Sequence, residues 1–392
     1  MLQKTLKTFF LFSFIFYSCQ NNSNNQESEI QETRNITVNI HNLDQKLDFD
    51  DFFEYSHHVI LQTTDSSLIS KIEKLQLRNS KYYILDRSQS ILLFDFTGKF
   101  IRSFNHKGQS GTEYIGANDM EVDDNGDIYV CDFSGSKIIK YNEKGVFLET
   151  IKIPVQTNSF KLLSQGRFAI NLQNGSSNNS AETCYNYHCF QNGRFICQAI
   201  PFNKHLKGYS YTYGYGKSSF YSYGGKIYTT STFNDTIYAI QENGCLNPFV
   251  RYDFGQKRLP LQSSAKEANE YMERVRLGEA VSSLYHFCMF GDYLFVSYDY
   301  QNQGNYIISK VNETPVYIGK FKSDKNGLYI IPIIYLSDAP VYQFATIVNA
   351  ESFEFILKRN KKVPGWIHEI SKSVEKEDNP VLIFYKWIYH TT

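Results

Sequence analysis

The feature that most constrains the fold is a unit that recurs along the chain with a period near 50 residues. In two consecutive copies, the segments 83–86 (Tyr-Ile-Leu-Asp) and 129–132 (Tyr-Val-Cys-Asp) are each followed by a second apolar run and a glycine turn. Spacings of 47, 48 and 51 residues separate the turn glycines, which are Gly98, Gly145, Gly193 and Gly244. A period of roughly 40–50 residues holding about four short strands is typical of a β-propeller. Because one such sheet leaves both faces exposed, the copies must stack against one another.

The chain length limits the number of units. The sequence has 392 residues, and from about residue 50 onward it has room for at most seven repeats. Two segments without strand patterning reduce that number to six. Phe, Trp and Tyr make up 16% of the residues, as expected for half-buried sheet surfaces. We therefore predict an all-β, six-bladed β-propeller domain over residues 36–392.

The first segment that departs from the strand pattern predicts a helix at about 264–277. Ser264 and Glu267 have the spacing of a capping box, in which each side chain bonds the other residue's backbone. Apolar residues then recur on one helical face, at Ala268, Met272 and Val275. This helix is expected to be an insertion between two blades.

The second such segment predicts a short helix just before the C-terminal strand. Ile367, Ile370 and Val374 form a short helical stripe after Pro364. The apolar run 381–387 follows and is predicted to be a strand. Such a strand would close the ring by completing a sheet begun by N-terminal residues.

The N-terminus has the features of an export signal. Lys4 and Lys7 precede the apolar run 9–16, which is too short to span a bilayer and ends close to Cys19. We interpret residues 1–18 as a lipoprotein signal peptide and Cys19 as the residue that is acylated. The alternative is an ordinary signal peptide followed by an unrelated cysteine.

The polar segment that follows predicts a tether. Residues 20–34 contain a single isoleucine and no aromatic residue, so they cannot bury enough surface to fold. Residues 19–35 are therefore expected to link the lipid flexibly to the propeller. Gln20, rather than aspartate, follows Cys19, so nothing favours retention at the inner membrane. We expect a lipid-anchored protein of the cell envelope, at the outer membrane, with the membrane face left open.

Charge and cysteine content bear on nucleic-acid binding and on disulfide formation. Lys and Arg total 40, as do Asp and Glu, so no basic excess predicts nucleic-acid binding. Six cysteines remain beyond Cys19, scattered through the domain, and are expected to be mostly buried thiols. Cys184 and Cys189 are the one pair close in sequence, and the sequence leaves open whether any cysteines form disulfides. It also leaves the oligomeric state open.

Several segments together resemble a known family. The repeat at 121–132 (EVDDNGDIYVCD) resembles an NHL-type propeller repeat. The segments 59–65, 108–114, 235–238, 252–255 and 379–382 look like landmarks of the six-bladed β-propeller lipoproteins of Gram-negative bacteria. The resemblance covers most of residues 50–387. It implies the fold and an envelope location, and it implies no particular activity.

One segment has the spacing of a calcium loop. Glu121, Asp123, Asn125 and Asp132 occupy oxygen-ligand positions around Gly126. The flanking residues alternate like strands rather than helices, which favours a hairpin turn at 124–126. We predict no metal site and no cofactor.

A tyrosine run is the best candidate for a ligand site. Its members alternate strictly, so in an extended segment all four rings would project from one face; they are Tyr209, Tyr211, Tyr213 and Tyr215. With Phe220, Tyr221 and Tyr223 nearby, they could form a platform for a sugar or a peptide. Packing of these rings between blades is the favoured interpretation, because propeller sheets bury many aromatic residues.

Other candidate groups have no partner at a recognised spacing. His57-His58 and the Tyr187-His188-Cys189 segment could supply metal ligands, but the lack of such a partner favours ordinary surface or core histidines. The sequence contains no nucleotide-binding loop, nucleophile elbow or zinc-protease helix. We therefore expect a binding or scaffold module for a protein or glycan partner. The alternative is a hydrolase or lyase acting on a carbohydrate or lactone, with His, Asp and Glu converging from at least three blades at the channel.

Overall fold

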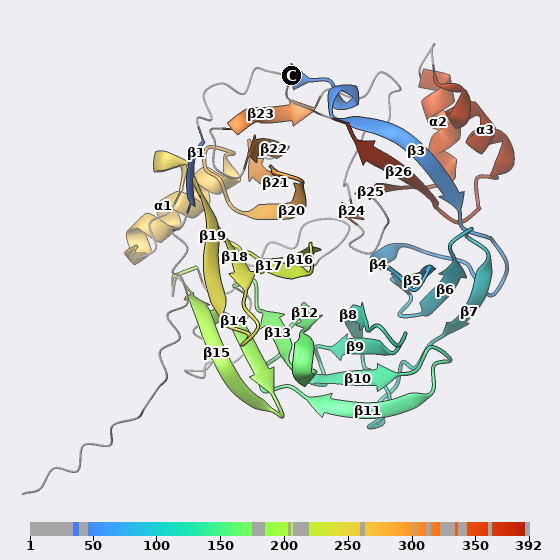
Figure 1. The fold of residues 1–392 in the computed structure, drawn as a ribbon, viewed down its shortest axis with the longest axis horizontal. Helices are drawn as coiled ribbons and strands as arrows, with labels where there is room; N and C mark the ends of the chain where they lie inside the picture. Colours follow the sequence, from blue (N-terminus) through green and yellow to red (C-terminus); the bar gives the residue numbers. More distant parts are fainter. Residues whose placement is uncertain are drawn as a thin grey trace, which may run out of the picture. The chain divides into compact units, whose positions relative to one another are not determined.

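Six antiparallel sheets stand around a ring, which confirms the predicted six-bladed propeller (Figure 1). The computed structural model describes residues 34–38, 46–174, 185–202, 205–206, 219–258, 263–301, 303–310, 315–321, 334–335, 343–359 and 363–388. Each sheet, here called a blade, runs from an innermost strand beside the ring's centre to an outermost strand at the rim. The two termini of the ring meet in one blade.

The first three blades follow the chain in order. Blade 1 contains β4 (Ile72–Arg78), β5 (Lys81–Asp86), β6 (Ile91–Asp95) and β7 (Phe100–Phe104). Blade 2 contains β8 (Ala117–Val122), β9 (Ile128–Asp132), β10 (Lys137–Tyr141) and β11 (Phe147–Lys152). Blade 3 contains β12 (Phe160–Leu162), β13 (Phe168–Asn171), β14 (Tyr185–Gln191) and β15 (Arg194–Pro201).

The last three blades combine the later chain with N-terminal strands. Blade 4 contains β16 (Phe220–Tyr223), β17 (Lys226–Thr229), β18 (Thr236–Ile240) and β19 (Leu246–Asp253). Blade 5 contains β20 (Leu284–Phe290), β21 (Tyr293–Tyr300), β22 (Gln303–Lys310) and β23 (Pro315–Phe321). Blade 6 contains β24 (Ile334–Tyr335), β25 (Gln343–Val348), β26 (Val381–Trp387) and β3 (Phe53–Ile60).

The ring closes as predicted, through the C-terminal strand. β26 pairs antiparallel with β3, with Val381 opposite Ile60 and Trp387 opposite Phe53. Two short N-terminal strands add further pairing at the rim. β1 (Arg34–Thr37) runs parallel to β19, and β2 (Lys46–Leu47) runs parallel to β23. The first three strands of the domain therefore lie at the outer edges of three consecutive blades.

The hydrophobic core is divided among the spaces between neighbouring blades. Strand residues that alternate inward fill these spaces, for example Tyr83 and Met120 between blades 1 and 2. Phe160 and Phe190 lie between blades 2 and 3, and Tyr252 lies between blades 4 and 5. Burying such an aromatic ring stabilises the fold by about 2–3 kcal/mol, so each interface depends on its neighbours being in place.

The repeated turn glycines mark close approaches between blades. A Cβ on Gly98 would lie 2.3 Å from the Ile60 carbonyl oxygen of the preceding blade, and one on Gly145 would lie 2.8 Å from the Phe104 ring. Gly193 differs, because no heavy atom lies within 4 Å of its Cβ position. Most of the glycines that define the sequence period therefore lie where a turn packs closely against the preceding blade.

The connections differ greatly between the two ends of the ring. Because each blade is an antiparallel meander, the links between first and second strands and between third and fourth strands lie at one end, here called the turn end. They include the two-residue connections 79–80, 192–193, 224–225 and 291–292. The other end, here called the insertion end, carries the long connections 254–283 and 349–380.

Three α-helices lie in these two long connections, toward the rim (Figure 1). They are α1 (Ala265–Arg276), α2 (Glu351–Arg359) and α3 (Gly365–Ser373). α1 confirms the prediction: Ser264 Oγ accepts a bond from the Glu267 backbone N–H, and the Glu267 carboxylate accepts one from the Ser264 N–H. α3 was also predicted, with Ile367 and Ile370 buried, whereas α2 was not.

Short 3-10 turns occur at Phe49–Asp51, Ser164–Gly166 and Gly255–Lys257. Within the described ranges, no helix is long and apolar enough to cross a membrane.

Candidate functional site

Four charged side chains converge on the inner strands of three consecutive blades. Lys74 lies on β4, Asp119 and Glu121 lie on β8, and Lys161 lies on β12. Lys74 Nζ is 2.8 Å from Asp119 Oδ1 and 3.5 Å from Glu121 Oε1. Lys161 Nζ is 2.6 Å from Glu121 Oε2. The two carboxylates of blade 2 therefore join it to blades 1 and 3, and we call these four residues the inner charge cluster.

Local strand geometry places Lys74 and Asp119 at equivalent points of successive repeats. Lys74 lies opposite Leu85, and Asp119 lies opposite Cys131, in each case one residue before the aspartate that ends the second strand. The pairing register shifts by one residue immediately before both Lys74 and Asp119. Such bulges re-aim the side chains that follow them. Opposite charges at the same point of two neighbouring blades can therefore meet.

The cluster is buried, and its members control one another's protonation. Burial alone would lower the pKa of Lys74, but the charges of Asp119 and Glu121 outweigh it and raise that pKa. Burial would likewise raise the pKa of Glu121, but Lys161 and Lys74 together lower it. Burial raises the pKa of Asp119, and the neighbouring Glu121 charge adds to that rise. Lys74 is therefore a cation at neutral pH and cannot act as a general base.

The carboxylate oxygens are already occupied by partners within the protein. Asp119 Oδ1 accepts bonds from Lys74 and the Met120 N–H, and Oδ2 accepts one from the Phe160 N–H. Gln76 Nε2 donates to Glu121 Oε1 at 3.0 Å. Buried charges that are paired and hydrogen-bonded in this way hold neighbouring elements in register. This arrangement suits an inter-blade lock better than proton transfer to a substrate.

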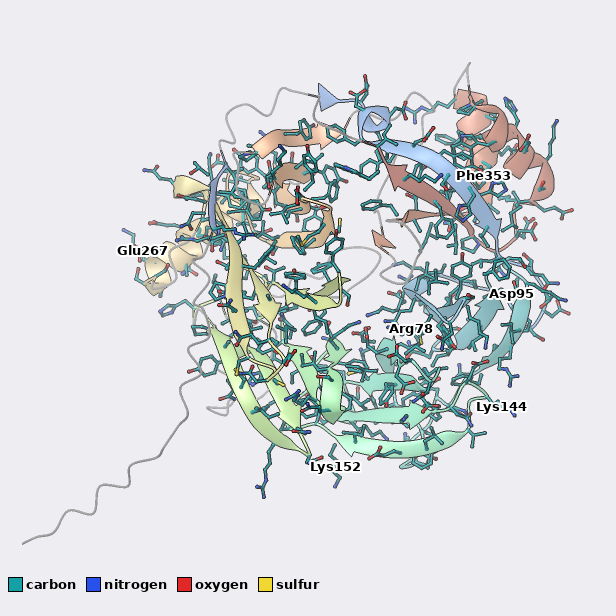
Figure 2. The ribbon with its side chains drawn as sticks, viewed as in Figure 1. Arg78, Asp95, Lys144, Lys152, Glu267 and Phe353 are labelled. Carbon is teal, nitrogen blue, oxygen red and sulfur yellow. The ribbon has the colours of Figure 1, made fainter. Side chains whose placement is uncertain are left out.

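Farther along the blade edges, the polar contacts become solvent-exposed. Arg78, at the end of β4 and labelled in Figure 2, pairs with Asp124 at 3.1 Å, and the Asp124 side chain is almost fully exposed. Lys81 Nζ pairs with Glu143 at 2.7 Å. Blades 1 and 2 are therefore joined by a series of charge contacts that passes from the buried cluster to the surface.

On its other side, the cluster continues into buried hydroxyl and amide groups. Ser159 precedes β12, and its Oγ lies 3.1 Å from Ser219 Oγ at the start of blade 4. The Thr229 hydroxyl donates to the Ser219 carbonyl and accepts a bond from Asn171 Nδ2. These residues lie at the insertion end of blades 3 and 4, so polar contacts cross three blade interfaces in succession.

The tyrosine run and the proposed acylated cysteine lie outside the described residues. This applies to Cys19, Tyr209, Tyr211, Tyr213 and Tyr215. The aromatic residues that follow the run are described, and they pack between blades. Phe220 is buried between blades 3 and 4, Tyr221 contacts the Phe287 ring, and the Tyr223 hydroxyl accepts a bond from the Gly291 N–H.

The calcium-like segment is a hairpin turn. The Asp123 and Gly126 backbones close a turn between β8 and β9, and Asp123 Oδ1 accepts bonds from the Asn125 and Asp127 N–H groups. Glu121 points instead to Lys74 and Lys161. Asp132 accepts bonds from the Ile115 and Gly135 N–H groups. Within the described ranges, no three His, Cys, Asp or Glu side chains are grouped to hold a metal ion.

Each of the histidines singled out in the sequence contacts a neighbouring side chain or backbone group, although His57 is exposed. His57 stacks on Phe384, and His58 Nδ1 is 2.8 Å from the Tyr55 hydroxyl. His188 is fully buried on β14, with Nε2 2.9 Å from the Tyr185 carbonyl. Burial lowers the pKa of His188 to about 4. None of these three residues contacts the inner charge cluster in the described structure.

Sequence reasoning did not identify the inner charge cluster, although a signal was present. Lys74 and Asp119 occupy the same position of two consecutive repeats, in each case opposite the residue before the aspartate that ends the second strand. Aligning the repeats strand by strand, and not by their glycines alone, would have placed the two charges side by side.

Solved structures show the same fold at low sequence identity. A Bacteroides fragilis protein described as a "Putative exported protein" is 19% identical with a TM-score of 0.73, over 91% of this chain and 99% of its own. A member of the DUF4221 family from Bacteroides vulgatus is 11% identical with a TM-score of 0.51, over 86% of this chain and 99% of its own. No curated protein sequence matched significantly. The model of one family, described as Domain of unknown function (DUF4934), matches residues 32–386, and the chain belongs to that family.

Proposed function

We propose that this protein is a lipid-anchored binding module of the cell envelope, which holds a protein or glycan partner at the insertion end of its propeller. The observation that carries the proposal is the contrast between the two ends of the ring. The three α-helices of the described residues and the longest connections lie at the insertion end, whereas four of the five two-residue connections lie at the turn end. In proteins of this kind, loops positioned by a rigid scaffold commonly carry the binding function.

The inner charge cluster favours binding over catalysis. Its carboxylates are buried and fully engaged by lysines, an amide and backbone N–H groups. A catalytic acid or base must reach the reacting atom of a substrate. The cluster instead fits a rigid ring that presents its loops in fixed positions.

The proposal that the protein is exported and lipid-anchored is based on its N-terminal segment. The Lys4 and Lys7 charges, the apolar run 9–16 and Cys19 have the order of a lipoprotein signal. The test is fractionation of cells expressing the full chain or its Cys19→Ser variant. We expect the full chain in the outer-membrane fraction and the variant in a soluble envelope fraction. Equal membrane association of both proteins would remove the anchor from the proposal.

The tyrosine run supplies the most specific binding test. The full chain and a variant with Tyr209, Tyr211, Tyr213 and Tyr215 changed to alanine would be compared on glycan and peptide arrays. Loss of an aromatic contact area of this kind is expected to weaken binding roughly tenfold or more. Phe96→Ala is the matched control, because Phe96 is 64% exposed at the turn end. Equal loss in the control, or no loss in the tyrosine variant, would contradict a site at the tyrosine run.

The alternative is a carbohydrate- or lactone-directed hydrolase or lyase. One observation favours it: Asp119 and Glu121 are adjacent carboxyls whose pKa values are shifted in opposite directions, as in some acid–base pairs. Turnover of such a substrate that is lost in Asp119→Asn and Glu121→Gln variants, both still folded, would establish this function in place of the first.

A further inference from the structure

Three cysteines gather where blade 3 meets blade 4, near the turn end. Cys189 on β14 and Cys197 on β15 are directly opposite each other in the antiparallel pair, so their side chains lie on the same face of the blade. That face packs against blade 4. Cys189 is fully buried there, and Cys197 contacts an apolar group that includes Leu246 of β19.

The third cysteine comes from the neighbouring blade. Cys245 ends the 241–245 turn directly before Leu246. Leu246 packs in the same apolar group as Cys197, and the Cys245 side chain is near enough to the Cys197 thiol to raise its pKa. The turn is held closely against blade 3, because a Cβ on Gly244 would lie 2.3 Å from Cys189 Sγ. The Tyr187 hydroxyl also donates to the Gly244 carbonyl at 2.6 Å.

We propose that Cys197 and Cys245 are a disulfide-forming pair that covalently links the outer strand of blade 3 to a turn of blade 4. Both residues are half-buried, whereas Cys189 is fully buried. An oxidant can therefore reach the Cys197–Cys245 pair more readily than any pair that includes Cys189. A disulfide needs two cysteines whose Cα atoms lie within about 7 Å. Cys245 lies between Gly244, which packs on Cys189, and Leu246, which packs beside Cys197.

The oxidant is a disulfide, either a small one or that of a thiol–disulfide oxidoreductase. One thiolate of the pair attacks the oxidant, forming a mixed disulfide and releasing one oxidant sulfur as a thiol. The second thiolate then attacks the protein sulfur of the mixed disulfide and releases the other. The pair loses two electrons and two protons, and the oxidant is reduced to two thiols.

The local environment makes this reaction pH-dependent. Burial and the neighbouring Cys245 thiol raise the pKa of Cys197 to about 12, and burial raises that of Cys189 to about 11. Because the thiolate is the attacking species, oxidation should be slow at neutral pH and faster as the pH rises toward 9.

The test uses the full chain incubated at pH 8.5 with excess oxidised glutathione, then denatured and alkylated for mass analysis. We expect two fewer alkylated cysteines than in a reduced sample, and a peptide map that joins residue 197 to residue 245. The pair should be absent from Cys197→Ser and Cys245→Ser variants and retained in Cys131→Ser and Cys288→Ser controls, which alter buried cysteines on blades 2 and 5.

Three results would overturn the proposal: complete alkylation after oxidation, a map that joins Cys189 to Cys197, or a disulfide that persists in the Cys245→Ser variant. The peptide map of the chain without substitutions tests the Cys197–Cys245 link even if a serine variant does not fold. Since the linked residues belong to different blades, the oxidised protein should also have a higher thermal unfolding midpoint than the reduced protein.

Discussion

Lys74 Nζ donates to Asp119 Oδ1 across 2.8 Å, joining the inner strand of blade 1 to that of blade 2. Each side chain is more than nine-tenths buried. The two residues are far apart in sequence but occupy the same point of successive repeats. The contact forms because blades 1 and 2 pack side by side, and it holds blade 2 in position relative to blade 1.

Removing the Lys74 charge should strongly destabilise the ring. In Lys74→Met, the buried Asp119 carboxylate loses its cation, and breaking such a pair typically costs about 3–5 kcal/mol. Urea unfolding of the full chain would measure the loss. The matched control is Lys144→Met, whose side chain projects from the rim of blade 2 (Figure 2) and should change stability by about 0.5 kcal/mol or less.

A second substitution separates charge from packing. If the Lys74→Met effect arises from the unpaired carboxylate, adding Asp119→Asn should recover part of the lost stability. Equal stability of the Lys74→Met and Lys144→Met variants would show that the cluster does not lock the inner strands.

The turn glycines offer an internally controlled comparison. Gly98 has φ +87° and faces the Ile60 carbonyl, so Gly98→Ala introduces both backbone strain and a clash with the preceding blade. Gly193 has φ +72° but open space around it, so Gly193→Ala introduces the strain alone. We expect Gly98→Ala to lower the free energy of unfolding by about 2 kcal/mol more than Gly193→Ala. Equal losses of stability in thermal or urea unfolding would mean that the close approach at Gly98 does not affect the free energy of unfolding.

Asn379 should be important for closing the ring. Its side chain accepts a bond from the Ile69 N–H and donates to the Gln62 and Ser67 carbonyls, and it is 1% exposed. Asn379→Ala leaves these backbone groups without their partner, which we expect to cost about 3 kcal/mol. Glu377→Ala, at an exposed position in the same loop, is the control. Hydrogen exchange should then show faster opening of β3 and β26 in Asn379→Ala alone, and unchanged exchange would contradict this role.

His188 should make stability depend on pH. Burial lowers its pKa from 6.5 to about 4, so the folded protein binds the proton less readily than the unfolded chain. The stabilisation is complete above pH 6.5 and is lost as the pH falls toward 4. Protonation would also place a donor at Nδ1, where Gln198 Nε2 lies at 3.1 Å.

The corresponding measurement compares the full chain with His188→Gln. Between pH 7.5 and 4.5, the free energy of unfolding of the unmodified chain should fall by about 2 kcal/mol more than that of the variant. Parallel pH profiles of the two proteins would show that other groups cause the acid sensitivity. His57 and His58, whose pKa values are also lowered, are candidates.

The sequence was sufficient to predict the architecture because the relevant signals are local and repeated. The Gly98–Gly145–Gly193–Gly244 spacing gave the blade period, and the Ser264–Glu267 box placed α1. The short strands β1 and β2 were missed, because each pairs with a strand that lies more than 200 residues away. α2 was missed as well, although Phe353 and Ile356 form its buried face.

The inner charge cluster was harder to predict for a physical reason. Lys74, Asp119 and Lys161 come from three blades, and no linear motif connects them. Their meeting depends on the register of three inner strands and on bulges beside two of the residues. The cysteine group at blades 3 and 4 depends in the same way on a turn of one blade packing against the next.

In-cell photo-crosslinking tests the proposed binding function most directly. A photoreactive phenylalanine analogue would replace Phe355 on α2 at the insertion end or Phe96 at the turn end, which are 58% and 64% exposed. We predict a discrete cross-linked partner, protein or glycan, from position 355 and none from position 96. Cross-links of equal yield from both positions, or from position 96 alone, would contradict binding at the insertion end.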